Sequence, residues 1–249
     1  NHVHPWPDRI PPWYCGHSRG TLPVVQRPEY RIVIDRQSHW QNVYATKSDA
    51  ELSWFQPAPA LSLSLFRQLD PRPRSALDVG GGQSPLAGEL LALGVQSVTV
   101  LDVSQSAIER SKQRLGELAR RVHWLESNVL ASPSLDKVDL WHDRACFHFL
   151  TDGAQVRSYV QLASRTVTPG GHLIIATFGP QGPERCSGLP VQRHDTASLA
   201  LSFAPAFELV RSAHETHQTP WGKPQEFVYA VLRREQRSQG SRGPSDSQA

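Results

Sequence analysis

The length, composition and charge of this 249-residue chain exclude several classes of protein. Its net charge is only +3, and its basic residues are spread along the chain rather than gathered in the stripe that nucleic acid prefers. No apolar run approaches the roughly 18 residues of a membrane span, and three widely spaced cysteines favour a reducing compartment. We therefore expect a cytoplasmic protein, a monomer or weak dimer, without nucleic-acid or membrane partners.

The two ends of the chain differ in composition from its centre. Residues 1–36 contain six prolines, which interrupt any helical period and predict an extended arm. Residues 236–249 are polar and poor in apolar side chains, which predicts a disordered tail. Between them, residues 37–235 form the predicted domain. Four side chains of the arm can bind metals, but their spacing fits no common zinc pattern, so no metal site is expected: His2, His4, Cys15 and His17.

In the central region, short β-branched runs alternate with helical patterns. The predicted strands are 75–79, 97–103, 122–129, 137–143 and 170–178. The predicted helices are 84–93, 104–121 and 153–167, and Ser104 is a suitable N-cap for the second. Such alternation predicts right-handed βαβ units, that is, an α/β fold with a doubly wound, Rossmann-like sheet.

The end of the domain breaks this alternation. Two strand-like runs, 206–219 and 226–234, are joined by the short sequence "PWGKP" without a helix between them. So short a connection makes an antiparallel hairpin. The sequence therefore predicts a mostly parallel sheet of seven strands that is closed by a C-terminal antiparallel hairpin.

A run of three glycines, Gly80 to Gly82, follows the first predicted strand in "LDVGGGQSPLAG". In an open α/β sheet this position faces the ligand crevice. A dinucleotide site needs a third glycine where Pro85 stands, and a Walker loop needs a Gly-Lys-Ser/Thr sequence that is absent here. The glycines indicate that a ligand approaches the backbone closely, although neither phosphate-binding motif is complete. The alternative is that they form a tight strand-to-helix turn that binds no ligand.

Polar residues recur at the ends of four successive predicted strands. They are Asp78, Asp102, Asn128 and Asp143. Asp102 lies 20 residues after Gly82, where a carboxylate accepts hydrogen bonds from ribose hydroxyls. An amide at the position of Asn128 is suited to reading an adenine edge. Each residue alone is also explained by solvation or capping, but four in register favour a nucleoside-containing ligand.

Four segments carry a resemblance to a known family. "LDVGGGQSPLAG", "VLDVS", "ESNVL" and "DLWHDRACFHFL" resemble motifs I to IV of the class I S-adenosylmethionine-dependent methyltransferases, although Ser84 stands where the last motif I glycine is expected. The closing hairpin is similar to that family's last two strands. "HWQNVYATKSDAELSWFQPAP" resembles a bacterial-type branch that begins with a Trp…Tyr…Ser-Trp-Phe-Gln segment. The likeness extends over residues 38–234.

The resemblance implies a binding site for S-adenosylmethionine. It places Asp78, Gly80 and Gly82 along the methionine part of the cofactor, and Asp102 at the ribose. Val103, Asn128 and Val129 would flank the adenine. Three aromatic residues of the N-terminal segment would close over the methionine end, although packing against the core is an equal explanation for them: Trp40, Tyr44 and Trp54.

Asp143 is the predicted catalytic residue, as a base or as a group that grips the acceptor. In a strand, Trp141 and Asp143 face one way and His142 the other, so we interpret His142 as structural. Five further residues are candidates for the acceptor side: Arg144, His148, Cys186, Arg193 and Trp221. For three of these the alternatives are an Arg144–Asp143 pair, a packed Cys186 thiol and a hydrophobic anchor at Trp221.

The resemblance predicts an enzyme that transfers a methyl group from S-adenosylmethionine to an unidentified nucleophile. The acceptor is either a protein lysine or a small molecule with a nitrogen, sulfur or oxygen nucleophile. Two alternatives stay open: an NAD(P)-dependent oxidoreductase, against which Pro85 and the hairpin count, and a non-catalytic cofactor-binding or interaction module.

Overall fold

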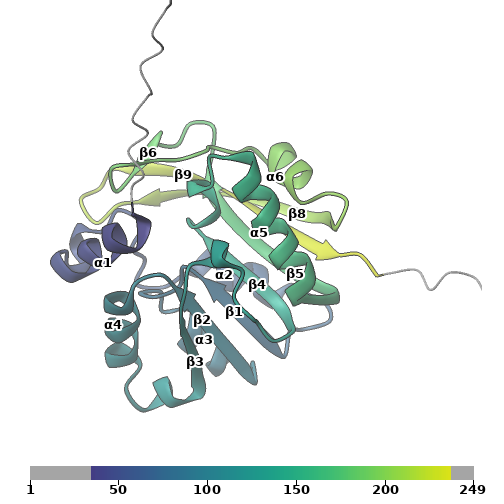
Figure 1. Ribbon diagram of the computed structural model, residues 1–249, viewed down its shortest axis with the longest axis horizontal. Helices are drawn as coiled ribbons and strands as arrows, with labels where there is room; N and C mark the ends of the chain where they lie inside the picture. Colours follow the sequence, from purple (N-terminus) through teal and green to yellow (C-terminus); the bar gives the residue numbers. More distant parts are fainter. Residues whose placement is uncertain (1–34, 237–249) are drawn as a thin grey trace, which may run out of the picture. The chain divides into compact units, whose positions relative to one another are not determined.

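The computed structural model describes residues 35–236, and its central feature is one seven-stranded sheet (Figure 1). The strand order is β3 (Val122–Glu126), β2 (Ser97–Asp102), β1 (Ser75–Val79), β4 (Val138–Arg144), β5 (Val167–Phe178), β9 (Pro224–Arg234) and β8 (Phe207–Gln218). The strands from β1 to β5 pair in parallel, and β9 and β8 pair antiparallel. The predicted fold class is confirmed, hairpin included.

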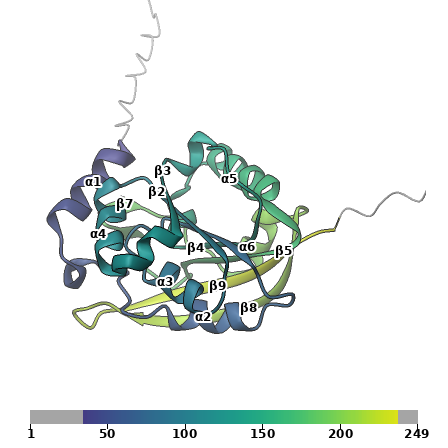
Figure 2. The ribbon, with the colours of Figure 1, turned by 90° about the horizontal axis from the view of Figure 1, so that it is seen from below.

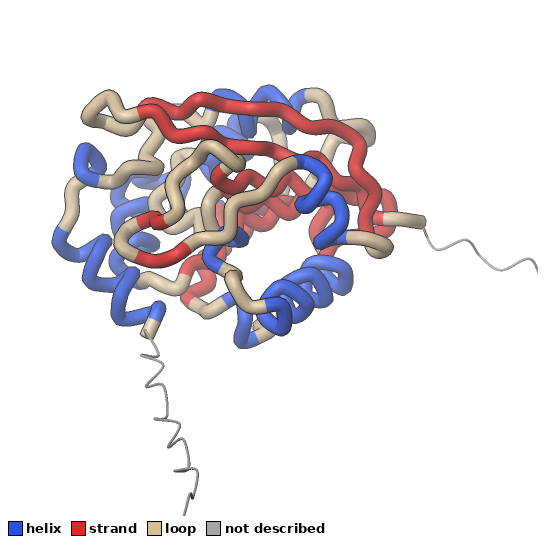
Figure 3. The backbone as a smooth tube through the Cα atoms, turned by 90° about the horizontal axis from the view of Figure 1, so that it is seen from above, coloured by secondary structure: helices blue, strands red, loops and turns tan. Residues whose placement is uncertain are grey.

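Helices cover both faces of this sheet (Figures 2 and 3). They are α1 (Arg36–Thr46), α2 (Ala60–Arg67), α3 (Leu86–Ala92), α4 (Gln105–Leu115), α5 (Gly153–Thr166) and α6 (Thr196–Phe203). Successive residues of β1 point into different cores. Ala76 packs in a cluster with α2 and α3, whereas Leu77 packs in a cluster with α5 and α6. The period of two in the strand thus assigns each face its own helices.

Short 3₁₀ helices and a small second sheet fill the connections. The turns are η1 (Asp49–Glu51), η2 (Gly116–Arg121), η3 (Val129–Ala131) and η4 (Phe147–Phe149), and the second sheet pairs β6 (Arg185–Cys186) with β7 (Leu189–Pro190). The predicted helix 104–121 begins as expected, because the Ser104 side chain accepts from the backbone N–H of Ala107. It does not continue to 121, because Gly116 adopts φ +56°, where α4 ends.

The strand order reverses between β1 and β4, which are parallel neighbours. The carboxyl ends of β1, β2 and β4 therefore meet at a topological switch point, where open α/β sheets bind ligands. The arm and the tail, with the four metal-capable side chains, lie outside the described residues apart from positions 35, 36 and 236. Between residues 35 and 236, every helix is too short or too polar to cross a membrane.

Candidate functional site

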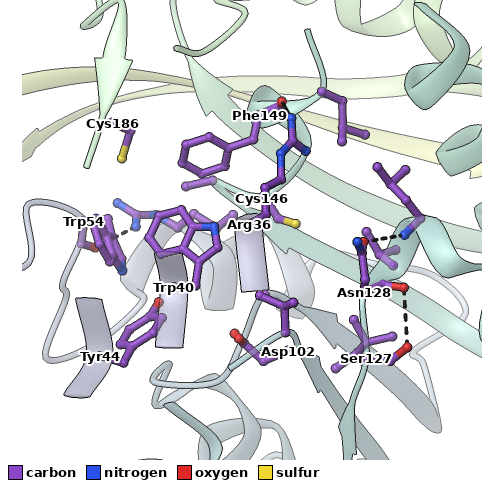
Figure 4. Close-up of a pocket in the computed structure, with 18 residues that line it drawn as sticks. Arg36, Trp40, Tyr44, Trp54, Asp102, Ser127, Asn128, Cys146, Phe149 and Cys186 are labelled. Carbon is purple, nitrogen blue, oxygen red and sulfur yellow. Dashed lines mark hydrogen bonds between the residues drawn. The ribbon is translucent and has the colours of Figure 1, made fainter. Parts of the chain in front are cut away.

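Two adjoining pockets open at the carboxyl ends of the parallel strands. The first lies between α1, the ends of β2 and β3, and the turn η4 (Figure 4). The second lies between the glycine loop and the segment that leads from η1 to α2. Four residues line both pockets: Tyr44, Trp54, Gly80 and Arg144. The two pockets therefore meet at one junction.

Asp102 lies at the base of the first pocket and organises the loops around it. Its carboxylate is buried and accepts from the backbone N–H of Gly82 (2.9 Å) and of Ser104 (2.8 Å). Burial raises the pKa of Asp102 to about 6, against the effect of these bonds. A carboxylate has about four acceptor sites, so Asp102 retains capacity for a ligand hydroxyl.

Val103, Asn128 and Val129 line the same pocket, as the resemblance implied. The Asn128 side-chain oxygen accepts from the backbone N–H of Leu130 (2.9 Å) and caps η3. This bond leaves the amide NH₂ group, rather than the oxygen, to meet a ligand edge. Ser127, which sequence reasoning did not single out, lies beside it in the lining.

The glycine loop is shaped by the two carboxylates that it contacts. A Cβ at position 81 would lie 2.2 Å from Oδ2 of Asp78, and a Cβ at position 82 would lie 2.6 Å from Oδ2 of Asp102. Gly80 adopts φ +68°, and it alone of the three lines both pockets. Gly82 lies outside both linings, so its role is to let Asp102 approach the loop.

The second pocket contains three buried polar atoms that lack a hydrogen bond within the described part of the chain. They are Oδ2 of Asp78, Oε1 of Gln83 and Nη2 of Arg144. Asp78 and Gln83 are 2% and 5% exposed. Buried polar groups are hydrogen-bonded in the great majority of cases, so the two oxygens, together with an Nη2 atom whose ionic partner Glu215 is 3.5 Å away, indicate a ligand.

Arg144 is held in place by its other guanidinium atoms. Nε donates to the hydroxyl of Tyr229 (3.0 Å) and Nη1 donates to the carbonyl of Trp54 (2.9 Å). The guanidinium carbon lies 4.3 Å from the centre of the Phe227 ring, and Nη2 lies 3.5 Å from a carboxylate oxygen of Glu215. The predicted pair with Asp143 is not formed. Arg144 instead presents a fixed cation to both pockets.

Three aromatic side chains, those that the resemblance placed at the methionine end, line the first pocket (Figure 4). The Trp40 ring lies 5.6 Å from the Trp54 ring and 6.1 Å from the Tyr44 ring, measured between centroids. Phe149, which sequence reasoning missed, completes the group at 5.1 Å from Trp40. The core-packing alternative also holds, because these rings pack in a cluster with buried Ala107 of α4 and with buried Leu52, which follows η1.

Asp143 faces away from both pockets, so its predicted orientation is wrong. It is 0% exposed, and its carboxylate accepts from the backbone N–H of Cys146 (2.8 Å), from that of Phe147 (3.2 Å) and from the hydroxyl of Tyr159. Burial raises its pKa to about 6. The alternation along β4 is as expected, but the face that meets a pocket carries His142.

The remaining acceptor-side candidates separate into lining and non-lining residues. Cys186 lines the first pocket, and burial raises its pKa to about 12, so it is a neutral thiol. His148 is fully buried in the core, where burial lowers its pKa to about 3. Arg193 pairs with Glu184 outside both linings, and Trp221 is 56% exposed at the hairpin tip.

Sequence reasoning missed several lining residues. Gln83 directly follows the three glycines, and its polar side chain in a close-approach loop was a usable signal. Arg36 lines the first pocket and donates to the carbonyl of Phe149 (2.7 Å), but the sequence assigned it to the arm. Cys146 lines the pocket directly after the predicted fourth strand.

Comparison with known sequences finds a matching family model and curated relatives. Residues 76–171, which contain β1 to β4 and α5, match the family model "Methyltransferase domain". Nodulation protein S of Rhizobium tropici is 33% identical over 112 residues, and the match covers 45% of each chain. Nodulation protein S of Sinorhizobium fredii is 28% identical over 103 residues, or 41% of this chain and 47% of that protein. The chain thus matches about half the length of these curated relatives.

Solved structures share the fold over most of the described chain. A structure from work on the conversion of a disulfide bond into a thioacetal group during echinomycin biosynthesis has a TM-score of 0.65 at 20% identity, over 81% of this chain and 94% of that one. The N-methyltransferase NodS of Bradyrhizobium japonicum, in complex with S-adenosylhomocysteine, has a TM-score of 0.60 at 18% identity, over 80% and 99%. The match of residues 76–171 to the methyltransferase domain model confirms the resemblance to class I S-adenosylmethionine-dependent methyltransferases.

Proposed function

We propose that this protein transfers a methyl group from S-adenosylmethionine to a nucleophilic acceptor. The observation that carries the proposal is the set of unsatisfied buried atoms in the second pocket. Two acceptors, on Asp78 and Gln83, and one cation, Arg144, match the ammonium and carboxylate of an amino acid. S-adenosylmethionine joins an amino acid to an adenosine, and the structure joins this pocket to a second one at a common edge.

The first pocket fits the adenosine part. Asp102 has free acceptor capacity for ribose hydroxyls, and the Asn128 amide lies beside the apolar Val129 for an adenine edge. The sulfonium connects the two halves of the cofactor, so we assign it to the junction beside Tyr44 and Trp54. Aromatic faces attract such a cation.

When bound, the cofactor supplies an electrophilic methyl group, and the residues of this chain mainly position it and exclude water. Three ionisable side chains that line the pockets, one phenol and two thiols, are not suited to act as bases. Burial raises the pKa of Tyr44 and of Cys146 well above their ordinary values, and that of Cys186 to about 12. We therefore propose that the acceptor arrives with its lone pair free. Asp143 stays a candidate for an indirect role in catalysis, because its hydrogen bonds to the N–H groups of Cys146 and Phe147 hold the η4 turn beside the first pocket.

An NAD(P)-dependent oxidoreductase is disfavoured by charge. The unpaired oxygen of Asp78 lies against Gly81, where a dinucleotide would bring its pyrophosphate. A buried carboxylate at that place repels a phosphate and attracts an ammonium. Pro85 also precedes the first residue of α3, where the dinucleotide fingerprint has its third glycine.

Calorimetry with S-adenosylhomocysteine and with NAD⁺ tests the proposal. We expect saturable binding of S-adenosylhomocysteine and none of NAD⁺ at the same concentration. Tighter binding of NAD⁺ would overturn the assignment. A screen of methyl transfer to amines, thiols, hydroxyls and proteins then identifies the acceptor. Transfer to none of these while the cofactor binds would favour the non-catalytic module. A cytoplasmic location, a monomeric or weakly dimeric state and the absence of nucleic-acid partners stay predictions.

A further inference from the structure

A buried chain of three polar side chains from three elements runs from the lining of the second pocket, which includes Asp78 and His142, into the core behind it. Nδ1 of His142, on β4, lies 2.7 Å from Oδ1 of Asp78, on β1. Nε2 of the same ring lies 2.9 Å from the hydroxyl of Ser62, on α2. Their exposed fractions are 3%, 2% and 1%. Asp78 and His142 are direct neighbours in the register of the parallel pair.

For an ionised Asp78 carboxylate and a neutral His142 ring, the hydrogen-bonding groups define the proton positions in this chain. An ionised carboxylate only accepts, so Nδ1 of His142 carries the proton that it donates to Asp78. In a neutral ring Nε2 then accepts, and the Ser62 hydroxyl is its donor. The Asp78 carboxylate thus selects the tautomer in which Nδ1 of His142 carries the proton, and the Ser62 hydroxyl holds the other side of the ring.

The consequence for Asp78 is a fixed orientation. One carboxylate oxygen is bound by His142, and the other, which no hydrogen bond satisfies among the described residues, lies in the lining of the second pocket beside Gly81. Rotation of the carboxylate would break its bond to His142. The buried chain therefore keeps a single acceptor atom of Asp78 available to a ligand.

We propose that His142 is a positioning residue that holds Asp78 ready to accept a hydrogen bond from the cofactor's amino group. This inference rests on the proposed function and deepens it. The order Ser–His–Asp is also that of a hydrolase triad, but Ser62 lies in the core outside both pocket linings. A serine at that place meets no substrate, so the three residues act on orientation rather than as a nucleophile.

Two ligands and a matched set of variants test the inference. S-adenosylhomocysteine carries the amino acid end, whereas 5′-methylthioadenosine lacks it and fills only the adenosine pocket. His142→Phe removes the bond to Asp78, and His142→Asn keeps an N–H near the position of Nδ1. His172→Phe makes the same change at another buried histidine, on β5, and controls for general loss of packing. Calorimetry measures the affinity of each folded variant for both ligands.

We expect His142→Phe to lower the affinity for S-adenosylhomocysteine on the order of tenfold to a hundredfold. The affinity for methylthioadenosine should stay within about threefold of the wild-type value. His142→Asn restores most of this loss, and His172→Phe changes neither affinity. Equal weakening of both ligands by His142→Phe, or no weakening of either, would overturn the inference. Wild-type protein that binds neither ligand would instead overturn the proposed function.

If His142→Phe does not fold, His142→Gln takes its place. The longer amide reaches toward the position of Nε2 and Ser62, and no longer supplies the donor to Asp78. His142→Gln is then expected to lower the affinity for S-adenosylhomocysteine but not for methylthioadenosine, whereas His142→Asn should lower neither. Equal affinities in the Gln and Asn variants would count against the role of the Nδ1 proton.

Discussion

Asp78 and Asp143 lie at the ends of adjacent strands and are both buried, but their hydrogen bonding differs. The Asp143 carboxylate accepts three bonds, two from the backbone and one from Tyr159, and it lies among the side chains that α5 covers. Within residues 35–236, Asp78 has one bonded and one unsatisfied oxygen, and it lines a pocket. Burial alone does not separate a structural carboxylate from a binding one. The completeness of its hydrogen bonds does.

The largest expected effect comes from removing the satisfied carboxylate. Asp143→Ala leaves two buried backbone N–H groups and the Tyr159 hydroxyl without their acceptor, so we expect the free energy of unfolding to fall by at least about 3 kcal/mol. Denaturant unfolding measures this loss, and the folded fraction should keep its affinity for S-adenosylhomocysteine. An Asp143→Asn variant with native stability but no methyl transfer would restore the catalytic role.

Asp102 is both a structural and a pocket-lining carboxylate, because it accepts hydrogen bonds from the loop and lines the first pocket. Asp102→Ala should weaken S-adenosylhomocysteine by about 1.5 to 3 kcal/mol and also destabilise the fold, since Gly82 and Ser104 lose their acceptor. The matched control is Asp139→Ala, which removes an acceptor of the Arg74 and Ser75 N–H groups at the start of β1. The control should lose stability without losing affinity. Equal affinity losses in both variants would show that Asp102 acts only through the fold.

The buried histidine and the buried carboxylates predict opposite dependences of stability on pH. The pKa of His148 is lowered to about 3, so the folded state resists protonation and this contribution is lost as pH falls below 6.5. The pKa values of Asp102 and Asp143 are raised to about 6, so their contribution is present below pH 4 and is lost as pH rises toward 6.

The His148→Phe variant isolates the histidine contribution. Between pH 4 and pH 6, its free energy of unfolding should decline less on acidification than that of the wild type, by up to about 1.4 kcal/mol per pH unit. Denaturant unfolding at several pH values provides the comparison. Parallel curves for variant and wild type would mean that His148 titrates normally in the folded state.

The smallest effect is expected at the hairpin tip. Trp221 is 56% exposed and lies outside both pockets, so Trp221→Ala should change the free energy of unfolding by less than about 0.5 kcal/mol and leave cofactor affinity unchanged. Calorimetry and denaturant unfolding check both statements. Lower methyl transfer at unchanged cofactor affinity would restore Trp221 as an acceptor contact, whereas weaker cofactor binding would show that the pockets extend to the hairpin.

The sequence predicts the edge of the sheet at which the site forms more reliably than the face on which each residue lies. Asp78, Asp102 and Asn128 reach the switch point because parallel strands must end at the same edge. The face was not predictable at β4. Trp141, His142 and Asp143 are all buried, so the pattern of apolar residues does not distinguish the two sides of the strand.

The sequence pattern also did not predict the elements that lie outside the alternation of strands and helices. The segment 179–193 is rich in glycine and proline, which is typical of a loop, but it contains the pair β6–β7, which brings Cys186 into the first pocket. Helix α6 lies directly after it and lacks a strong amphipathic period, since its sequence "TASLALSF" is mostly small and apolar. Tertiary packing, rather than local propensity, defines both.

The affinity difference between S-adenosylhomocysteine and 5′-methylthioadenosine in the unmodified protein tests the central claim most directly. If the unsatisfied atoms of Asp78, Gln83 and Arg144 hold an amino acid end, S-adenosylhomocysteine should bind at least about tenfold more tightly. Equal affinities in calorimetry would mean that the second pocket contributes nothing to cofactor binding, and would contradict this account of the site.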